Sequence, residues 1–230
     1  MVNLKLDFCD AKAARYAVMH WHYSKRMPLE PLVKIGVWED GAFIGVVLFG
    51  RGASWNLGNR FGLGATEWCE LVRIALRSHV TPVSRIIRIA LKLLRDSSPN
   101  LRMAISFADP SEGHHGGIYQ ASGWVYTGES GIAKQYYHMG RWKHNREITY
   151  GFGVPGEVGL AELKKLPMRK MPGKHRYAFP LDPALRPMLQ AMSRPYPKKI
   201  GAGSSEPPGH PPDEGGAAPT PALHLRRGGR

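Results

Sequence analysis

Apolar residues follow two patterns along this chain, one typical of strands and one typical of helices. Short apolar runs of strand length, bounded by turn residues, occupy residues 4–8, 33–38, 43–49, 70–76, 103–108, 124–128 and 135–140. Stretches with helical spacing or helix-start signals occupy residues 11–20, 81–95 and 116–122. Because strands and helices alternate along the chain, the pattern predicts an α/β fold.

The sharpest local signals are a hairpin turn and a helix. Asp40-Gly41 separates two apolar runs, and this dipeptide is a strong hairpin signal. Further along, Thr81 and Pro82 provide an expected N-cap and first helical residue. One face of the predicted helix is apolar and consists of Val83, Ile86, Ile87, Ala90 and Leu94. The opposite face is basic, either solvated or in contact with an anionic partner, and consists of Arg85, Arg88, Lys92 and Arg95.

We expect one folded domain followed by a tail, since domains typically span ~100–200 residues. Residues 193–230 contain eight of the 19 prolines and almost no bulky apolar residues, so this tail is expected to be disordered. No apolar run approaches ~20 residues and no signal peptide is visible, which predicts a soluble, cytoplasmic protein. Cys9 and Cys69 are the only cysteines, and we expect both to be small core residues without a disulfide or zinc site.

The charge of the chain indicates a polyanionic partner. The formal net charge is +14 and the pI is about 10.0, and such a surplus favours nucleic acid or anionic membrane. No basic amphipathic membrane helix stands out. Between residues 141 and 176, nine Lys and Arg residues are accompanied by three acids. We therefore expect a nucleic-acid partner, and a merely solvated basic surface is the alternative.

A strand end followed by polar residues is the first candidate site. Within residues 106–128, Asp109 follows a buried strand, and His114 and His115 lie in the glycine-rich turn after it. In open α/β sheets, ligands bind beyond the carboxyl ends of the strands. We therefore expect these three residues at an active-site edge, and an ordinary Asp-Pro turn is the alternative.

Two segments resemble the acetyltransferases of the GNAT superfamily. The helix start at residues 81–85 offers backbone amides where that superfamily holds the pyrophosphate of acetyl-CoA, although its glycine-rich loop is absent here. Tyr119, four residues before Gly123-Trp124, is similar to the superfamily's tyrosine that acts as an acid near the donor thiol. The alternative for Tyr119 is packing against the sheet. The resemblance implies a site for acetyl-CoA or a related acyl donor at Thr81, Val83, Ser84 and Arg85.

Further motifs together resemble the phage-encoded Mom DNA-modification family. They are His22-Tyr23-Ser24-Lys25-Arg26-Met27-Pro28, Phe49-Gly50-Arg51-Gly52-Ala53, Glu70-Leu71-Val72-Arg73-Ile74, Phe107-Ala108-Asp109-Pro110 with Gly113-His114-His115-Gly116-Gly117-Ile118-Tyr119, and Gly173-Lys174-His175-Arg176-Tyr177. The resemblance covers roughly residues 7–182. It implies an enzyme that converts adenine in double-stranded DNA to N6-carbamoylmethyladenine in the host cytoplasm and so protects phage DNA from restriction.

The same resemblance implies a GNAT-like α/β fold with a mixed central sheet flanked by helices and a basic C-terminal extension. Residues 1–140 would form the catalytic domain. Residues 141–192 would form the extension, packed on that domain and contacting DNA, and residues 193–230 the tail. The residues expected to contact DNA are Arg51, Lys164, Lys165, Lys170, Lys174 and Arg176.

The residue types suit chemistry on a flipped adenine. Asp109 is expected to orient the exocyclic amine or accept its proton, with Tyr119 as a further catalytic residue. Tyr23 and Ser24 are expected to position the base or the donor. The base could stack on aromatic side chains, and the candidates are Trp21, Tyr23 and Trp55. The alternative is ordinary packing, which is the more frequent role of such residues.

Histidines near Asp109 raise the question of a metal. His22, His114 and His115 could join Asp109 in a two-histidine, one-carboxylate set, which is typical of iron sites, and iron involvement is suggested for the Mom family. A metal-free role for these histidines is the alternative. Two rival functions also stay open. One is an ordinary N-acetyltransferase acting on a small amine or a protein, and the other is a DNA-binding protein without catalytic activity.

Overall fold

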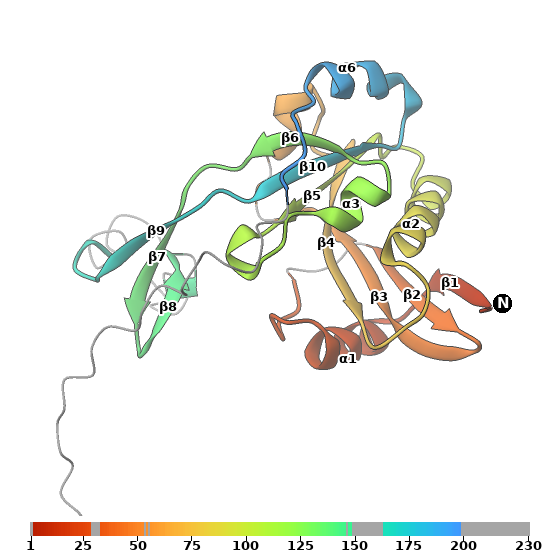
Figure 1. Cartoon of the computed structure of the whole chain (residues 1–230), viewed down its shortest axis with the longest axis horizontal. Coiled ribbons are helices and arrows are strands. Elements are labelled where there is room, and N and C mark those ends of the chain that lie inside the picture. Colours follow the sequence, from red (N-terminus) through yellow and green to blue (C-terminus); the bar gives the residue numbers. More distant parts are fainter. Residues whose placement is uncertain are drawn as a thin grey trace, which may run out of the picture. The chain divides into compact units, whose positions relative to one another are not determined.

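Seven strands form a mixed sheet in the computed structural model of the chain, which describes residues 2–28, 33–52, 54, 56–145, 147–148 and 163–198 (Figure 1). Their spatial order is β1 (Leu4–Phe8), β2 (Val33–Glu39), β3 (Ala42–Gly50), β4 (Trp68–Leu76), β5 (Met103–Ala108), β10 (His175–Pro180) and β6 (Val125–Glu129). The neighbours β4 and β5 are parallel, and the other neighbouring pairs are antiparallel. The expected α/β fold with a mixed central sheet is confirmed.

Helices cover both faces of this sheet. On one face, Ala14, Ala17 and Val18 of α1 (Ala11–Trp21) pack against Val46 and Leu48 of β3. On the opposite face of the same strand, Val47 and Phe49 belong to one buried cluster with apolar residues of α2 (Val83–Ser97) and with Tyr119 of α3 (Gly117–Ala121). Since successive side chains of a strand point to opposite faces, one apolar strand supplies both layers of the core. Leu189 of the short α6 (Arg186–Ala191) packs in a second buried cluster with Met103 and Ile105 of β5 and Ala178 of β10.

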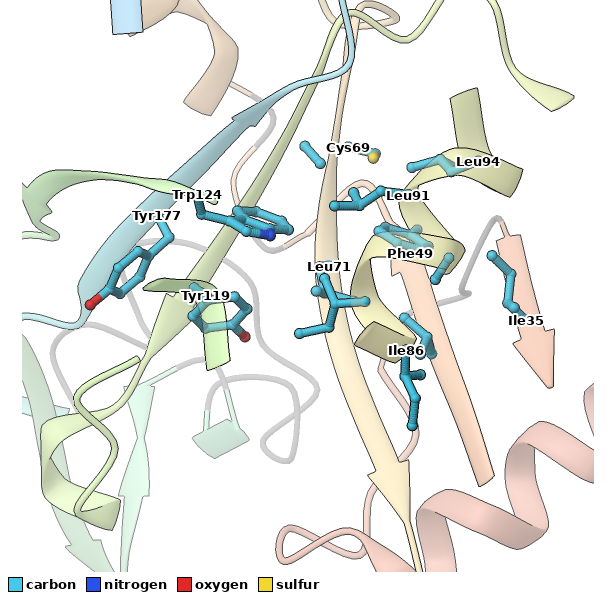
Figure 2. Packing of buried hydrophobic residues seen from close by; sticks show 14 of the residues in the cluster. Ile35, Phe49, Cys69, Leu71, Ile86, Leu91, Leu94, Tyr119, Trp124 and Tyr177 are labelled. Atoms are coloured by element: carbon cyan, nitrogen blue, oxygen red, sulfur yellow. The ribbon is translucent and has the colours of Figure 1, made fainter. Parts of the chain in front are cut away.

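The predicted apolar face of α2 is confirmed. Ile86, Ile87, Ala90 and Leu94 have no exposed surface, and they recur at intervals of three and four residues, so they share one side of the helix. Figure 2 shows Ile86 and Leu94 beside side chains of the sheet, and both belong to the same buried cluster as Phe49. The basic residues of the opposite face include Lys92, which forms an ion pair with Asp96 at 3.2 Å.

The expected N-cap of α2 is wrong. The helix begins at Val83, its N-cap position is Pro82, and no side chain caps it. Instead, the Glu39 carboxylate at the end of β2 accepts hydrogen bonds from the backbone amides of Thr81 (2.7 Å) and Val80 (3.0 Å). A residue from a distant strand therefore satisfies amides just before the helix, a contact that local sequence does not encode.

The hairpin between β2 and β3 turns at the predicted dipeptide. Asp40 and Gly41 both have positive φ angles, +47° and +80°, as a two-residue turn of this hand requires. The register pairs Glu39 with Ala42 directly across the turn. The turn therefore sets the position of Glu39, whose carboxylate then reaches the start of α2.

The central sheet extends beyond the expected boundary at residue 140. Strand β10 lies between β5 and β6 and pairs with both. The preceding residues form a second, three-stranded sheet in the order β8 (Arg141–His144), β7 (Ala133–His138) and β9 (Met168–Met171). This small sheet is an insertion between β6 and β10, and residues 1–199 form one compact unit. The predicted disorder of the tail falls largely outside the described residues.

Two further expectations concern cysteines and membranes. Both cysteines are free, and Cys69 is buried in the core while Cys9 is partly buried. Within the described ranges, no helix is long and apolar enough to span a membrane.

Candidate active site

A cavity of about 1110 Å³ lies where the two parallel strands part. β4 and β5 are paired only from Trp68 to Glu70 and from Met103 to Ile105, although both strands continue. Beyond the paired residues, the second half of β4 lines the cavity together with Phe107 of β5. The site thus follows from the loss of strand pairing at the carboxyl ends of parallel strands, where ligands commonly bind.

Asp109 lies in this cavity and is paired with a lysine. It follows β5 directly, and its carboxylate accepts a hydrogen bond from the Ser111 amide at 3.0 Å. The Lys174 ammonium lies 2.8 Å from the other carboxylate oxygen, Oδ2. Burial is the largest single effect on the pKa of Asp109 and would raise it. The hydrogen bond and charge of Lys174, together with hydrogen bonds from Ser111, lower the pKa below its usual value. Asp109 is therefore an ionised hydrogen-bond acceptor at neutral pH.

Tyr119 of α3 is buried and also borders the cavity. Its hydroxyl lies 2.8 Å from the Ser106 hydroxyl, which lies 2.9 Å from the Leu71 carbonyl oxygen. Burial raises the pKa of Tyr119 to about 12, so the hydroxyl keeps its proton at neutral pH. The ring also packs between Trp124 and Tyr177, as Figure 2 shows. Packing against the sheet and a position at the cavity are thus both realised.

His22 and Tyr23 line the cavity just after the end of α1, whereas Ser24 does not line it and contacts His22. The Ser24 amide donates to Nδ1 of His22 at 3.1 Å, so this nitrogen carries no proton, and the Ser24 hydroxyl lies 2.8 Å from it. The Tyr23 ring is about half exposed and meets the His114 ring edge-on, with centroids 5.5 Å apart. Tyr23 and Trp21 both line the cavity, whereas Trp55 lies outside the described residues.

We predict that His22 lowers the free energy of unfolding as the pH decreases from 7.5 to 5. Burial and, secondarily, the charge of Arg73 lower the pKa of His22 from 6.5 to about 4. The unfolded chain therefore binds a proton in this range that the folded chain does not, which destabilises the fold by about 2 kcal/mol at pH 5. Urea unfolding at both pH values should show this difference between the wild type and His22→Gln. An equal pH dependence of the two proteins would contradict the prediction.

The expected iron ligands are not assembled into one site. In the part of the chain that the structure describes, no group of three or more His, Cys, Asp or Glu side chains could hold a metal ion. His22 and His114 both line the cavity, but His115 does not. The backbone carbonyl of His115 instead accepts a hydrogen bond from the Tyr177 hydroxyl at 2.6 Å, which fixes its turn against β10.

The start of α2 differs from the expected phosphate cradle. The amide of Thr81 is held by Glu39, and Pro82 has no amide hydrogen to offer. Hydrogen bonds from Thr81 and Val80 lower the pKa of Glu39, so a negative charge lies where a phosphate would have to approach. Val83 lines the cavity, Ser84 is partly buried and Arg85 is exposed. A pyrophosphate therefore does not fit at the Thr81 amide.

The residues expected to contact DNA fall into two groups. Arg51, Lys164, Lys165 and Lys170 are exposed, in agreement with a surface role. Lys174 is exposed too, but its ammonium is at the cavity, beside Asp109. Arg176 is 3% exposed, and its guanidinium donates to the Thr127 hydroxyl and to the carbonyls of Thr127 and Glu129. Its donors thus hold β10 against β6, and the expectation of a surface contact is wrong for Arg176.

Sequence reasoning missed charged residues that the structure adds to the site. Glu70 and Arg73 line the cavity from β4, and the signal for them was two charges inside an otherwise apolar strand.

A second addition is a set of ion pairs between separate segments. Glu147 forms ion pairs with Arg26 (2.9 Å), which follows α1, and with Arg141 (3.3 Å) of β8. The small sheet is thereby joined to the segment that carries His22.

Comparison with known proteins gives one family and several distant structures. The Mom protein family matches residues 3–198. The methylcarbamoylase Mom of Escherichia phage Mu is 28% identical over 208 residues, which cover 85% of this chain and 84% of that protein. A putative acetyltransferase from Acinetobacter baylyi is 10% identical with a TM-score of 0.45, covering 79% of this chain and 94% of that one. A putative acetyltransferase from Salmonella typhimurium, solved with its cofactor acetyl-CoA, is 13% identical with a TM-score of 0.43, covering 78% of this chain and 95% of that one.

Proposed function

Because the chain belongs to the Mom protein family, we propose that it modifies DNA by placing a carbamoylmethyl group on the N6 amine of adenine. The observation that carries the proposal is the family match, which spans nearly the whole described fold. The methylcarbamoylase of phage Mu supplies the reaction class. The modified amine would no longer present its usual donor in the major groove, so restriction enzymes that read it would fail.

The cavity suits a base that has left the duplex. Adenine N6 lies inside the stacked helix, so an enzyme that acts on it must first turn the base outward. The cavity, about 1110 Å³ in volume, offers aromatic side chains at Trp21 and Tyr23 together with polar groups. A flipped base could stack on an aromatic ring while its amine faces the carboxylate of Asp109.

We assign Asp109 the task of orienting the amine and taking its proton. Alkylation of N6 forms a bond from the amine nitrogen to the methylene carbon of the donor. The bond from that carbon to the donor's leaving group breaks, the leaving group takes the electron pair, and one of the two amine protons is released. An ionised carboxylate accepts a hydrogen bond from this amine before the reaction and can receive the proton as the bond forms. Because Lys174 lowers the pKa of Asp109, the carboxylate is a weak base, and orientation is its larger contribution.

The other predicted catalytic residues take supporting roles. Tyr119 keeps its proton at neutral pH, so its hydroxyl can donate a hydrogen bond but not act as a base. Ser24 holds Nδ1 of His22 free of a proton, which leaves the neutral ring with its hydrogen on Nε2. We propose that this N–H and the Tyr23 hydroxyl position the base or the donor.

The donor of the carbamoylmethyl group would enter the same cavity. Acyl transfer from acetyl-CoA would leave an acetyl group on the amine, whereas a carbamoylmethyl group is joined through its methylene carbon and carries an amide nitrogen. The expected acyl donor therefore does not account for the product by acyl transfer alone. In addition, the amides of Val80 and Thr81 are already held by Glu39. We therefore assign no step to a pyrophosphate at the start of α2. Among the four expected donor-binding residues, Val83 remains the one that lines the cavity.

Double-stranded DNA is the proposed partner, and the host cytoplasm is the proposed place of action. The net charge of +14 favours a polyanion. Exposed lysines of β9 and of the segment just before this strand, Lys164, Lys165 and Lys170, supply phosphate contacts. Such contacts do not read the DNA sequence.

Nucleoside mass spectrometry of DNA from cells that express the chain tests this function. We expect an adenine derivative heavier by the mass of a carbamoylmethyl group, together with resistance of that DNA to restriction enzymes whose sites contain adenine. An acetylated amine in protein or in small molecules would favour the N-acetyltransferase reading. Unmodified adenine, without any newly acetylated amine, in cells that contain folded, DNA-bound protein would favour the function of a DNA-binding protein without catalytic activity.

A further inference from the structure

An exposed isoleucine stands at the rim of the cavity. Ile132 is 68% exposed, and its neighbours in the chain, Gly131 and Ala133, both line the cavity. Consecutive Cα atoms lie about 3.8 Å apart, so the side chain begins within one residue of the cavity wall on either side. Single exposed apolar residues are common on proteins, so the place of Ile132 carries the argument and its exposure alone does not.

The segment that carries Ile132 is fixed to the partner of Asp109. The Ser130 amide donates to the Lys174 carbonyl at 2.8 Å, and the Lys174 amide donates to the Ser130 hydroxyl at 2.8 Å. The Lys174 ammonium in turn lies 2.8 Å from Asp109. The segment that carries Ile132 is thus joined through one lysine to the carboxylate proposed to hold the target amine.

A pair of like charges follows Ile132 on the small sheet. Lys134 of β7 lies directly opposite Lys170 of β9 in the antiparallel register, and both are exposed. Like charges in such positions repel and destabilise a sheet unless an anion lies between or over them. Neither lysine forms an ion pair with any residue that the structure describes. An anionic chain such as a DNA strand would remove this repulsion.

We propose that Ile132 enters the base stack of duplex DNA and fills the space left by the adenine that turns into the cavity, while Lys134 and Lys170 hold adjacent phosphates. The inference rests on the proposed function. Proteins that distort DNA insert apolar side chains, isoleucine among them, between base steps. Filling the gap opposes the return of the flipped base, because the duplex cannot close around the inserted side chain.

Met139 provides a matched control. It is the most exposed large apolar residue described, at 82%, and it lies at the turn between β7 and β8. It does not line the cavity. Strand β7 has six residues, so the turn lies roughly 20 Å along the strand from Ala133. If only exposed apolar surface mattered, replacing either residue by serine would lower thymine reactivity. A role in base flipping predicts the loss for Ile132 alone.

Permanganate footprinting tests the proposal without knowledge of the donor or the target sequence. A thymine whose adenine partner has left the stack becomes open to permanganate. Purified full-length protein would be bound to a long duplex of mixed sequence, with occupancy matched between variants by a gel-shift titration. We expect reactive thymines with the wild type, Ile132→Leu and Met139→Ser, and a loss of about tenfold or more in their reactivity with Ile132→Ser.

Two results would overturn the role of Ile132. One is equal thymine reactivity for the wild type and Ile132→Ser at matched occupancy. The other is an equal loss for Ile132→Ser and Met139→Ser. The modified nucleoside in cells is measured separately with the wild type, so failure of the proposed function shows there. If cells contain the modified adenine but the wild type opens no thymine, the flipping inference alone fails.

Discussion

Asp109→Asn is expected to lower adenine modification by about a hundredfold or more while leaving the fold intact. The substitution keeps the acceptor oxygen for the Ser111 amide, so the turn after β5 is preserved. It removes the negative charge that faces Lys174 and that would receive the amine proton. The measurement is the fraction of modified adenine in DNA from cells that express equal amounts of wild type and variant, with thermal unfolding as the test of folding.

Asp182→Asn is the matched control for this change. Asp182 also precedes a short 3-10 helix, and its carboxylate accepts from the Ala184 amide at 2.9 Å, much as Asp109 accepts from Ser111. It is paired with a basic residue too, Arg102, at 3.0 Å, but it does not line the cavity. We expect near-normal modification with Asp182→Asn. A folded Asp109→Asn variant with near-normal modification would return Asp109 to the role of a turn residue.

Reversing three exposed lysines should weaken DNA binding strongly. The variant has Lys164, Lys165 and Lys170 all changed to Glu. For each phosphate contact that is lost, one counterion fewer is released from the DNA on binding. The slope of log K against log salt should therefore become shallower by about 2.7. Lys174 is left unchanged because it faces Asp109, so its replacement would disturb the cavity as well. Fluorescence anisotropy with one mixed-sequence duplex at several salt concentrations measures both the affinity and the slope.

The basic face of α2 offers a control with the same change in charge. Arg85, Arg88 and Lys92 are exposed on one helix face, and their replacement by Glu alters the net charge by the same amount. We expect this variant to retain most of the affinity and the steeper slope. Equal losses in both variants would mean that binding follows total charge, and the assignment of the contacts to the small sheet and its flank would be lost.

Local patterns in the sequence were enough to predict those elements whose cause is local. The helix over residues 83–97 follows from apolar residues at intervals of three and four, because a helix places such positions on one side. The turn at Asp40-Gly41 follows from the positive φ angles that these residue types tolerate. Asp109 at the cavity follows from its place directly after a buried strand.

Contacts between distant parts of the chain were decided only by the tertiary structure. The basic composition after residue 140 predicted an extension, but strand pairing inserts β10 between β5 and β6 and buries Arg176. The same insertion brings Lys174 to Asp109. Glu39 reaches the amide of Thr81 because the hairpin belongs to the sheet on which the helix packs. The threonine hydroxyl is therefore not needed as a cap.

The physical reason is the range over which each interaction acts. Helical and strand periodicity depends on neighbours within a few residues, which the sequence displays directly. The order of strands in a sheet, and the ion pairs that form at their ends, depend on which distant segments bury their apolar faces together. The sequence by itself thus determined most strands and helices before residue 140, the family resemblance and one acidic residue of the site. The tertiary structure determined that residue's basic partner, the separation of His115 from the cavity, and the place of Ile132 at its rim.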